Sequence, residues 1–254
     1  MKLVYLCEDS PTDIFSAVHP AWRQHLQGVQ TDIALAAQYE TEFFCEYLPV
    51  EPSAANAAAV TRMIRRHLGS EAEYCLYTAC LAADPQKASA VLQTLFASRT
   101  LSDSRRIMDH LSHPSVQKVA KLSRFVGNEA HFFMGFVRFQ ELRSQVLFSE
   151  ITPKSFVLPV IAEHFSNRLP LENWVIYDKT HHVSLVHQKQ QPWFLLSGST
   201  LNELAISELS DTEKSIEELW IRFFHTIAIK ERTNLKLQTQ NLRKRFQRDM
   251  VEFQ

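Results

Sequence analysis

The spacing of apolar residues changes along this chain, and that change limits the folds open to it. Up to about residue 130, and again beyond residue 210, apolar side chains recur at the three- and four-residue steps of helices. Between these parts lie short runs rich in aromatic and β-branched residues, which are typical of strands. The runs are residues 136–142, 146–151, 174–178, 183–187 and 193–197. Their short links favour antiparallel hairpins, so the sequence predicts an α+β fold with an antiparallel sheet of four to five strands, a helix-rich N-terminal half and a helical C-terminus.

The N-terminal half carries the clearest signals for where elements begin and end. Residues 3–7 predict an edge or core strand, and Ser10 can cap the helix that follows it. A second strand is predicted at residues 43–48. Ser53 can cap an alanine-rich helix, and Gly69 can end that helix by adopting a conformation with positive φ.

The C-terminal third predicts a long amphipathic helix. Ser210 and Glu213 have the spacing of a capping box. An apolar stripe follows at helical spacing and comprises Ile216, Leu219, Trp220, Phe223, Phe224 and Ile227. Since exposing such a stripe is costly, we expect it in the core. We expect one α+β domain over residues 1–254, or alternatively a helical lobe over residues 1–110 and an α+β core over residues 111–254.

Composition excludes several classes of protein. The formal net charge is -1, so nucleic acid would have to bind a local basic patch. Only 5 glycines argue against a glycine-rich nucleotide fold, and the 4 cysteines include no C-x-x-C pair. No apolar run has the length of a signal peptide or a membrane span. We therefore expect a cytoplasmic protein with reduced thiols.

The most informative basic segment lies near the C-terminus. Residues 219–254 contain eight Lys or Arg and only three Asp or Glu. Such groups bind phosphates, amide side chains add base or sugar contacts, and an aromatic ring can stack on a base. The candidate nucleic-acid-binding residues here are Lys230, Arg232, Asn234, Gln238, Arg243, Lys244, Arg245 and Phe246. The alternative is a solvated helical tail, or a helix that pairs with the acidic run at residues 203–218.

A second basic cluster surrounds a possible acid–base pair. Its candidate phosphate-binding residues are Lys118, Lys121, Arg124 and Arg138. Glu129 and His131 lie between them and could act as acid and base on an anionic substrate. On a continuous helix these two side chains point about 200° apart, so they meet only if the helix ends near Gly127. Structural roles for both residues are the alternative.

No signal for a bound metal or cofactor stands out. His110 and His113 lie one helical turn apart, but no carboxylate or thiol joins them at a familiar spacing. The cysteines lack the signature of a radical-SAM cluster, and no phosphate-binding loop or nucleophile motif is present. We therefore expect no metal and no cofactor in this chain.

Three segments carry a resemblance to a known family: residues 121–142, 158–187 and 227–246. Together they resemble the probable DNA-metabolism family found next to a putative DNA-modification or repair radical-SAM protein. A similar domain is fused to some uracil-DNA glycosylases. The resemblance implies a role in DNA metabolism with a radical-SAM protein as partner, an inference from genomic association. The family's C-terminal run usually reads like Met-Pro-Lys-Arg-Tyr-Trp, whereas here only Phe246 remains to stack on a base.

Three functions follow as expectations. The first is an accessory protein in DNA metabolism or repair that binds nucleic acid or presents a substrate to its radical-SAM partner. The second is an enzyme that acts on DNA bases or backbone with Glu129 and His131. The third is a purely structural partner subunit. A deep cleft in which Glu129, His131 and arginines converge would favour the enzyme, whereas basic residues spread over a shallow face would favour binding.

Overall fold

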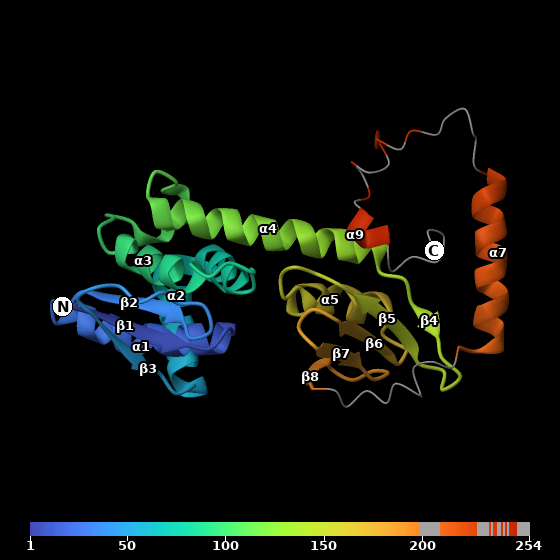
Figure 1. Ribbon diagram of the computed structural model, residues 1–254, viewed down its shortest axis with the longest axis horizontal. Helices are drawn as coiled ribbons and strands as arrows, with labels where there is room; N and C mark the ends of the chain where they lie inside the picture. The colour runs from blue at the N-terminus through green and yellow to red at the C-terminus, as the bar shows by residue number, and fades with distance from the viewer. Residues whose placement is uncertain are drawn as a thin grey trace. The chain divides into compact units, whose positions relative to one another are not determined.

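The computed structural model describes residues 1–198 and 209–227, together with positions 234, 236–237, 240, 242 and 244–247. The predicted α+β class is confirmed, because helices accompany a three-stranded sheet and a five-stranded sheet (Figure 1). The chain divides into two compact units, Met1–Asn128 and Glu129–Gln254. The lobe expected at residues 1–110 lies within the first unit, which contains a sheet as well as helices.

The sheet of the first unit is entirely parallel. Strand β1 (Lys2–Cys7) lies between β2 (Thr31–Leu35) and β3 (Cys45–Pro49). β1 is thus a central strand, and β2 was missed by the sequence prediction because it is short and half polar. Helix α1 (Pro11–Leu26) makes the crossover from β1 to β2. The Ser10 hydroxyl caps this helix by accepting a hydrogen bond from the Asp13 amide at 3.1 Å.

The next helices of the first unit are α2 (Ala54–Cys80), α3 (Lys87–Ser98) and the 3-10 helix η1 (Ser104–Asp109). Helix α2 is interrupted at Gly69, which has φ 90° and ψ 173°. The prediction that Gly69 ends a helix is therefore confirmed, and a second helical segment starts directly after it.

Helix α4 (Pro114–Phe136) is longer than predicted. We expected helical spacing up to about residue 130 and a strand over residues 136–142, but the helix continues to Phe136 and β4 (Gln140–Glu141) has only two residues. The physical reason is the run of apolar side chains at the end of α4. Phe132, Phe133 and Phe136 all contact the ring of Phe246, an arrangement that a continuous helix supplies.

The sheet of the second unit is mixed rather than fully antiparallel, so that part of the prediction is wrong. Its strand order is β4-β5-β6-β7-β8. The four strands after β4 are β5 (Leu147–Ile151), β6 (Trp174–Asp178), β7 (Val183–His187) and β8 (Phe194–Ser197). β5 and β6 are parallel, and the other neighbours are antiparallel. The link from β5 to β6 contains helix α5 (Leu158–Arg168), which makes it a crossover connection.

The core of the second unit is aromatic. Trp174 is fully buried, and its ring stacks on His187 with a centroid distance of 5.0 Å. Phe139 and Phe165 pack against Trp174, and Phe246 packs in the same core cluster. This cluster joins α4, α5 and the sheet.

The C-terminal helices differ from the prediction in what they bury. Helix α7 (Asp211–Ile227) begins as expected, with the Glu213 amide donating to the Ser210 hydroxyl at 3.0 Å. The predicted core stripe is wrong for Ile216, Leu219 and Trp220, which are 53%, 63% and 41% exposed. An amphipathic pattern predicts a helix, but it does not show which part of the protein, if any, packs against the apolar stripe. The side chains of Phe223, Phe224 and Ile227 lie outside the described part of the molecule; the short helix α9 is Lys244–Gln247.

Candidate nucleic-acid interface

One side of α4 presents cations, amides and an aromatic ring to solvent. We call it the α4 face, and its residues are Gln117, Lys121, Arg124, Phe125 and Asn128, all of them exposed. At about 100° per residue, these five side chains fall within an arc of about 100°. The opposite side carries Val116, Val119, Leu122 and Val126, which are buried. Burial of that apolar side fixes the orientation of the α4 face.

The α4 face is cationic because no acid on the helix offsets its charges. Between Pro114 and Asn128, α4 contains no Asp or Glu. Within the described residues, Lys121 and Arg124 form no ion pair. Phe125 is 43% exposed, so part of its ring is accessible to a ligand. The α4 face therefore offers two unpaired cations about one helical turn apart, Lys121 and Arg124, with the ring of Phe125 next to Arg124.

Lys118 does not belong to this face. Its ammonium donates to Asp84 Oδ2 at 2.7 Å, and both side chains are partly buried. The pair ties α4 to the loop before α3, so the charge of Lys118 is compensated within the protein. The prediction that Lys118 binds phosphate alongside Lys121 is not supported by this geometry.

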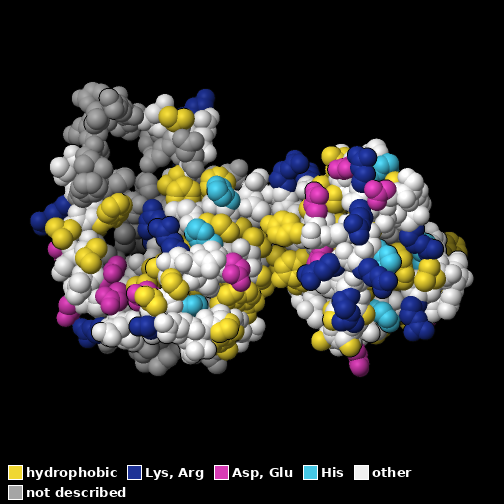
Figure 2. Space-filling view, turned by 180° about the vertical axis from the view of Figure 1, so that it is seen from behind, with side chains coloured by type: hydrophobic (Ala, Val, Ile, Leu, Met, Phe, Trp, Pro, Cys, Tyr) yellow, Lys and Arg dark blue, Asp and Glu magenta, His cyan; other side chains and the backbone are white. Residues whose placement is uncertain are grey.

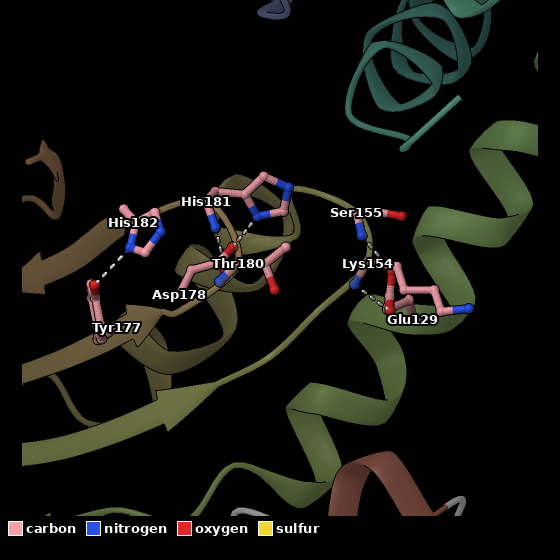
Figure 3. A network of polar contacts seen from close by, with 8 residues as sticks. All are labelled: Glu129, Lys154, Ser155, Tyr177, Asp178, Thr180, His181 and His182. Carbon is pink, nitrogen blue, oxygen red and sulfur yellow. Dashed lines mark hydrogen bonds and ion pairs between the residues drawn. The ribbon is translucent and has the colours of Figure 1, made fainter. Parts of the chain in front are cut away.

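Glu129 is a buried anchor rather than an exposed acid (Figure 3). Only 2% of the residue is exposed. Its two carboxylate oxygens accept hydrogen bonds from the backbone amides of Lys154 and Ser155, at 3.0 and 2.9 Å. These amides lie in the loop between β5 and α5, so the carboxylate fastens that loop to α4.

His131 lies on the exposed side of the same helix and does not meet Glu129. Because α4 continues to Phe136 without a break at Gly127, the two side chains point in nearly opposite directions. The predicted acid–base pair of Glu129 and His131 is therefore wrong.

A different carboxylate–imidazole pair occurs at the turn between β6 and β7, and sequence reasoning missed it (Figure 3). Asp178 is fully buried, and its Oδ2 lies 2.6 Å from Nδ1 of His181. Its Oδ1 accepts from the backbone amides of Thr180 and His181 at 2.9 and 3.1 Å. The edge of Phe156 lies against the imidazole. The arrangement fits a proton on Nδ1 and leaves Nε2 as an acceptor; the only sequence signal was an Asp three residues before a His at the end of a strand.

The C-terminal candidates are only partly described. The ring of Phe246 is 3% exposed, with centroids 5.0 Å from Phe133 and 5.3 Å from Phe132. It is a core residue, so the prediction that it stacks on a base is wrong. Lys244 is exposed, and the exposed Asn234 accepts a hydrogen bond from the Leu237 amide. Four candidates and one side chain lie outside the described residues: Lys230, Arg232, Gln238 and Arg243, and the side chain of Arg245.

Arg138 follows α4 and folds back onto it. Its guanidinium donates to the carbonyl oxygens of Gly135 and Val137 at 3.4 and 3.5 Å, and the residue is half-buried. These contacts cap carbonyls at the end of the helix. A structural role therefore accounts for Arg138.

Two of the four cysteines, Cys7 and Cys80, are buried. Burial raises the pKa of the Cys7 and Cys80 thiols to about 12, which keeps both protonated and poorly nucleophilic. Among the residues that the structure describes, no three His, Cys, Asp or Glu side chains are grouped to hold a metal ion. In the same residues, no helix combines the length and apolar character needed to cross a membrane.

Comparison with known families places most of the second unit in a domain family. A family model for a domain of unknown function, DUF4130, matches residues 85–252. The matched part covers more than half of the chain and includes α4 and the five-stranded sheet. No curated protein matches the sequence.

Proposed function

We propose that this chain, which belongs to the DUF4130 family, binds nucleic acid as an accessory protein in DNA metabolism. The α4 face carries the proposal, because two unpaired cations, an exposed ring and two amides share one side of a helix without an acid among them. The resemblance described above supplies the link to DNA.

Each group on the α4 face has a matching partner in a nucleic acid. Lys121 and Arg124 can neutralise phosphates, and Arg124 offers forked donors. Phe125 can stack on an unpaired base, which favours single strands over duplex. The amides of Gln117 and Asn128 can contact sugar or base edges. The face is convex, as a helix surface must be, so it suits binding better than enclosed catalysis.

The proposed partner is a radical-SAM protein, on the strength of the resemblance alone. In this role the chain would hold nucleic acid while the partner supplies the iron–sulfur chemistry. Co-expression with the neighbouring gene product followed by pull-down tests the contact. Failure to co-purify at low salt, with and without an oligonucleotide, would remove physical partnership from the proposal.

The central experiment measures binding of single-stranded and duplex oligonucleotides over a salt series. If Lys121 and Arg124 each neutralise one phosphate, the double variant K121A/R124A flattens the slope of log K against log salt by about 1.8 on duplex or about 1.4 on single strands. F125A should cost about 1–3 kcal/mol on single strands and little on duplex. R168A/K189A removes the same charge from exposed positions in the other unit and serves as the matched control.

The proposal predicts that the control keeps the wild-type slope. Absence of binding by the wild type at low salt would overturn it, and so would equal slopes for K121A/R124A and the wild type. In either case a structural subunit without nucleic acid becomes the better description.

A second candidate function, direct chemistry on DNA, is favoured by one observation. Asp178 orients His181 so that Nε2 is available as a proton acceptor. H181N retains an amide donor toward Asp178 but has no equivalent of Nε2. Conversion of an oligonucleotide by the wild type and not by H181N would support the enzyme, whereas no conversion by either leaves Asp178 and His181 as stabilisers of the turn.

A further inference from the structure

Three exposed arginines lie on two elements that contact each other, the first segment of α2 and η1. Arg62 and Arg66 lie one turn apart on the outward side of α2, and Arg105 lies in η1; all three are exposed. The Ser104 hydroxyl donates to the carbonyl oxygen of His67 at 2.9 Å, which fastens η1 to the end of that helical segment. We call Arg62, Arg66 and Arg105 the arginine surface. Figure 2 shows Lys, Arg and His side chains gathered on one face of this unit.

Three acids in the adjoining turns are engaged with other groups. Glu73 accepts two hydrogen bonds from Arg65, at 2.6 and 2.7 Å, and Asp109 pairs with Arg106 at 3.1 Å. Asp103 accepts from the backbone amide of its own turn at 3.1 Å. From Ala54 to Leu68, α2 itself contains no Asp or Glu.

The three arginines are therefore left without an anionic partner. Within the part of the chain that the structure describes, none of Arg62, Arg66 and Arg105 forms an ion pair. Like charges at positions i and i+4, such as Arg62 and Arg66, repel each other on a helix. The negative end of the helix dipole near Gly69 favours cations in the last turn, but it offers the guanidinium groups no acceptor.

We infer that the arginine surface binds the phosphate backbone of a nucleic acid. All five cations of this region of α2 and η1 are arginines, and none is a lysine. Forked guanidinium donors fit phosphate oxygens in pairs, whereas charge alone would be served equally by lysine. No exposed aromatic ring belongs to the surface, so it holds the backbone and does not read bases.

This inference rests on the proposed function and adds a second contact to it. Arg62 and Arg66 precede the residues that the family model matches. The arginine surface is thus built largely by the part of the chain that lies before the matched domain. The arginine surface strengthens binding to nucleic acid of any sequence, while Phe125 on the α4 face distinguishes single strands from duplex.

The test compares the full chain with R62A/R66A/R105A in the same salt series. If each arginine neutralises one phosphate, the slope falls by about 2.7 on duplex and about 2.1 on single strands. R62K/R66K/R105K preserves the charge and should keep most of the slope of log K against log salt. It should still bind more weakly than the wild type, because lysine lacks the paired donors of a guanidinium group. K154A/R168A/K189A removes three exposed cations elsewhere and should bind as the wild type does.

Chemical protection of the wild type supplies a readout that does not depend on how a variant folds. Phenylglyoxal modification followed by mass spectrometry should show Arg62, Arg66 and Arg105 protected by an oligonucleotide. Arg168 should react equally with and without it. Poly-glutamate of equal charge should protect the three arginines far less than the oligonucleotide does.

The outcomes separate this inference from the proposed function. Unchanged affinity and slope for R62A/R66A/R105A, with unprotected arginines, overturns the arginine surface even if K121A/R124A weakens binding. Equal protection by poly-glutamate also overturns it, because the surface would then be a general site for acidic chains. Weakened binding by R62A/R66A/R105A with no effect of K121A/R124A supports the arginine surface and rejects the α4 face. No binding by the wild type ends both.

Discussion

Replacing Glu129 tests whether its buried carboxylate is structural. In E129A, the amides of Lys154 and Ser155 lose their acceptors; the hydrogen bond from Ser155 is buried, and the one from Lys154 is partly buried. A buried donor left unsatisfied costs about 1–3 kcal/mol. The variant should lose about that much of its free energy of unfolding through the Ser155 amide, and less through the Lys154 amide, which water can reach. Typical totals are about 5–15 kcal/mol. E129Q keeps one acceptor oxygen and should lose less.

The assay pairs urea denaturation with hydrogen exchange. E129A should shift the urea midpoint downward and speed amide exchange in peptides that contain Lys154 and Ser155. H131A is the matched control, since His131 is an exposed neighbour on the same helix. It should change neither quantity. If E129A unfolds like the wild type and its loop amides stay protected, the carboxylate is not an anchor and the argument for a structural role fails.

Three further predictions concern burial and backbone geometry. F246A should lower the free energy of unfolding by about 3–5 kcal/mol, as large-to-small core changes do. L219S on the exposed stripe of α7 should change the urea midpoint little. If L219S were the more destabilising of the two, the assignment of core and surface would be refuted. The free energy of unfolding should fall as pH rises from 9 toward 12, because the pKa of the Cys7 and Cys80 thiols is 9.0 in the unfolded chain and about 12 in the folded protein. Urea denaturation at a series of pH values should show a weaker pH dependence for C7A/C80A. G69A should lower the melting temperature through backbone strain alone, because φ is 90° and no atom lies near the added Cβ; an unchanged melt would contradict it.

Features fixed by neighbouring residues were predictable from the sequence. Ser10 and Ser210 cap helices as their positions suggested, and Gly69 interrupts α2 where only a positive φ fits. These outcomes depend on hydrogen bonds and dihedral angles within a few residues. The predicted strands at 174–178 and 183–187 were likewise confirmed, since their alternation is local.

Features fixed by distant partners were not predictable. The sequence could not show that β5 and β6 are parallel, because that depends on where α5 packs after it forms. It could not show that Phe246 fills a core beside α4, because basic neighbours made it resemble a stacking ring. The carboxylate of Glu129 accepts from amides 25 and 26 residues away, beyond any spacing rule for helices. Each wrong prediction followed a local sequence pattern at a place where a long-range contact decides the structure.

The same distinction decides which cations of α4 can reach a ligand. Lys118 and Lys121 look equivalent in sequence, three residues apart on one helix. Lys118 is compensated by Asp84, which is 34 residues away in sequence and 2.7 Å away in space. Lys121 has no such partner among the described residues, and the surrounding positions are Gln, Arg, Phe and Asn rather than Asp or Glu. A net charge of -1 for the chain conceals this asymmetry, because most acids lie elsewhere. What singles out the α4 face is therefore the absence of compensating acids around exposed cations, a property of the fold that a count of charges along the sequence does not contain.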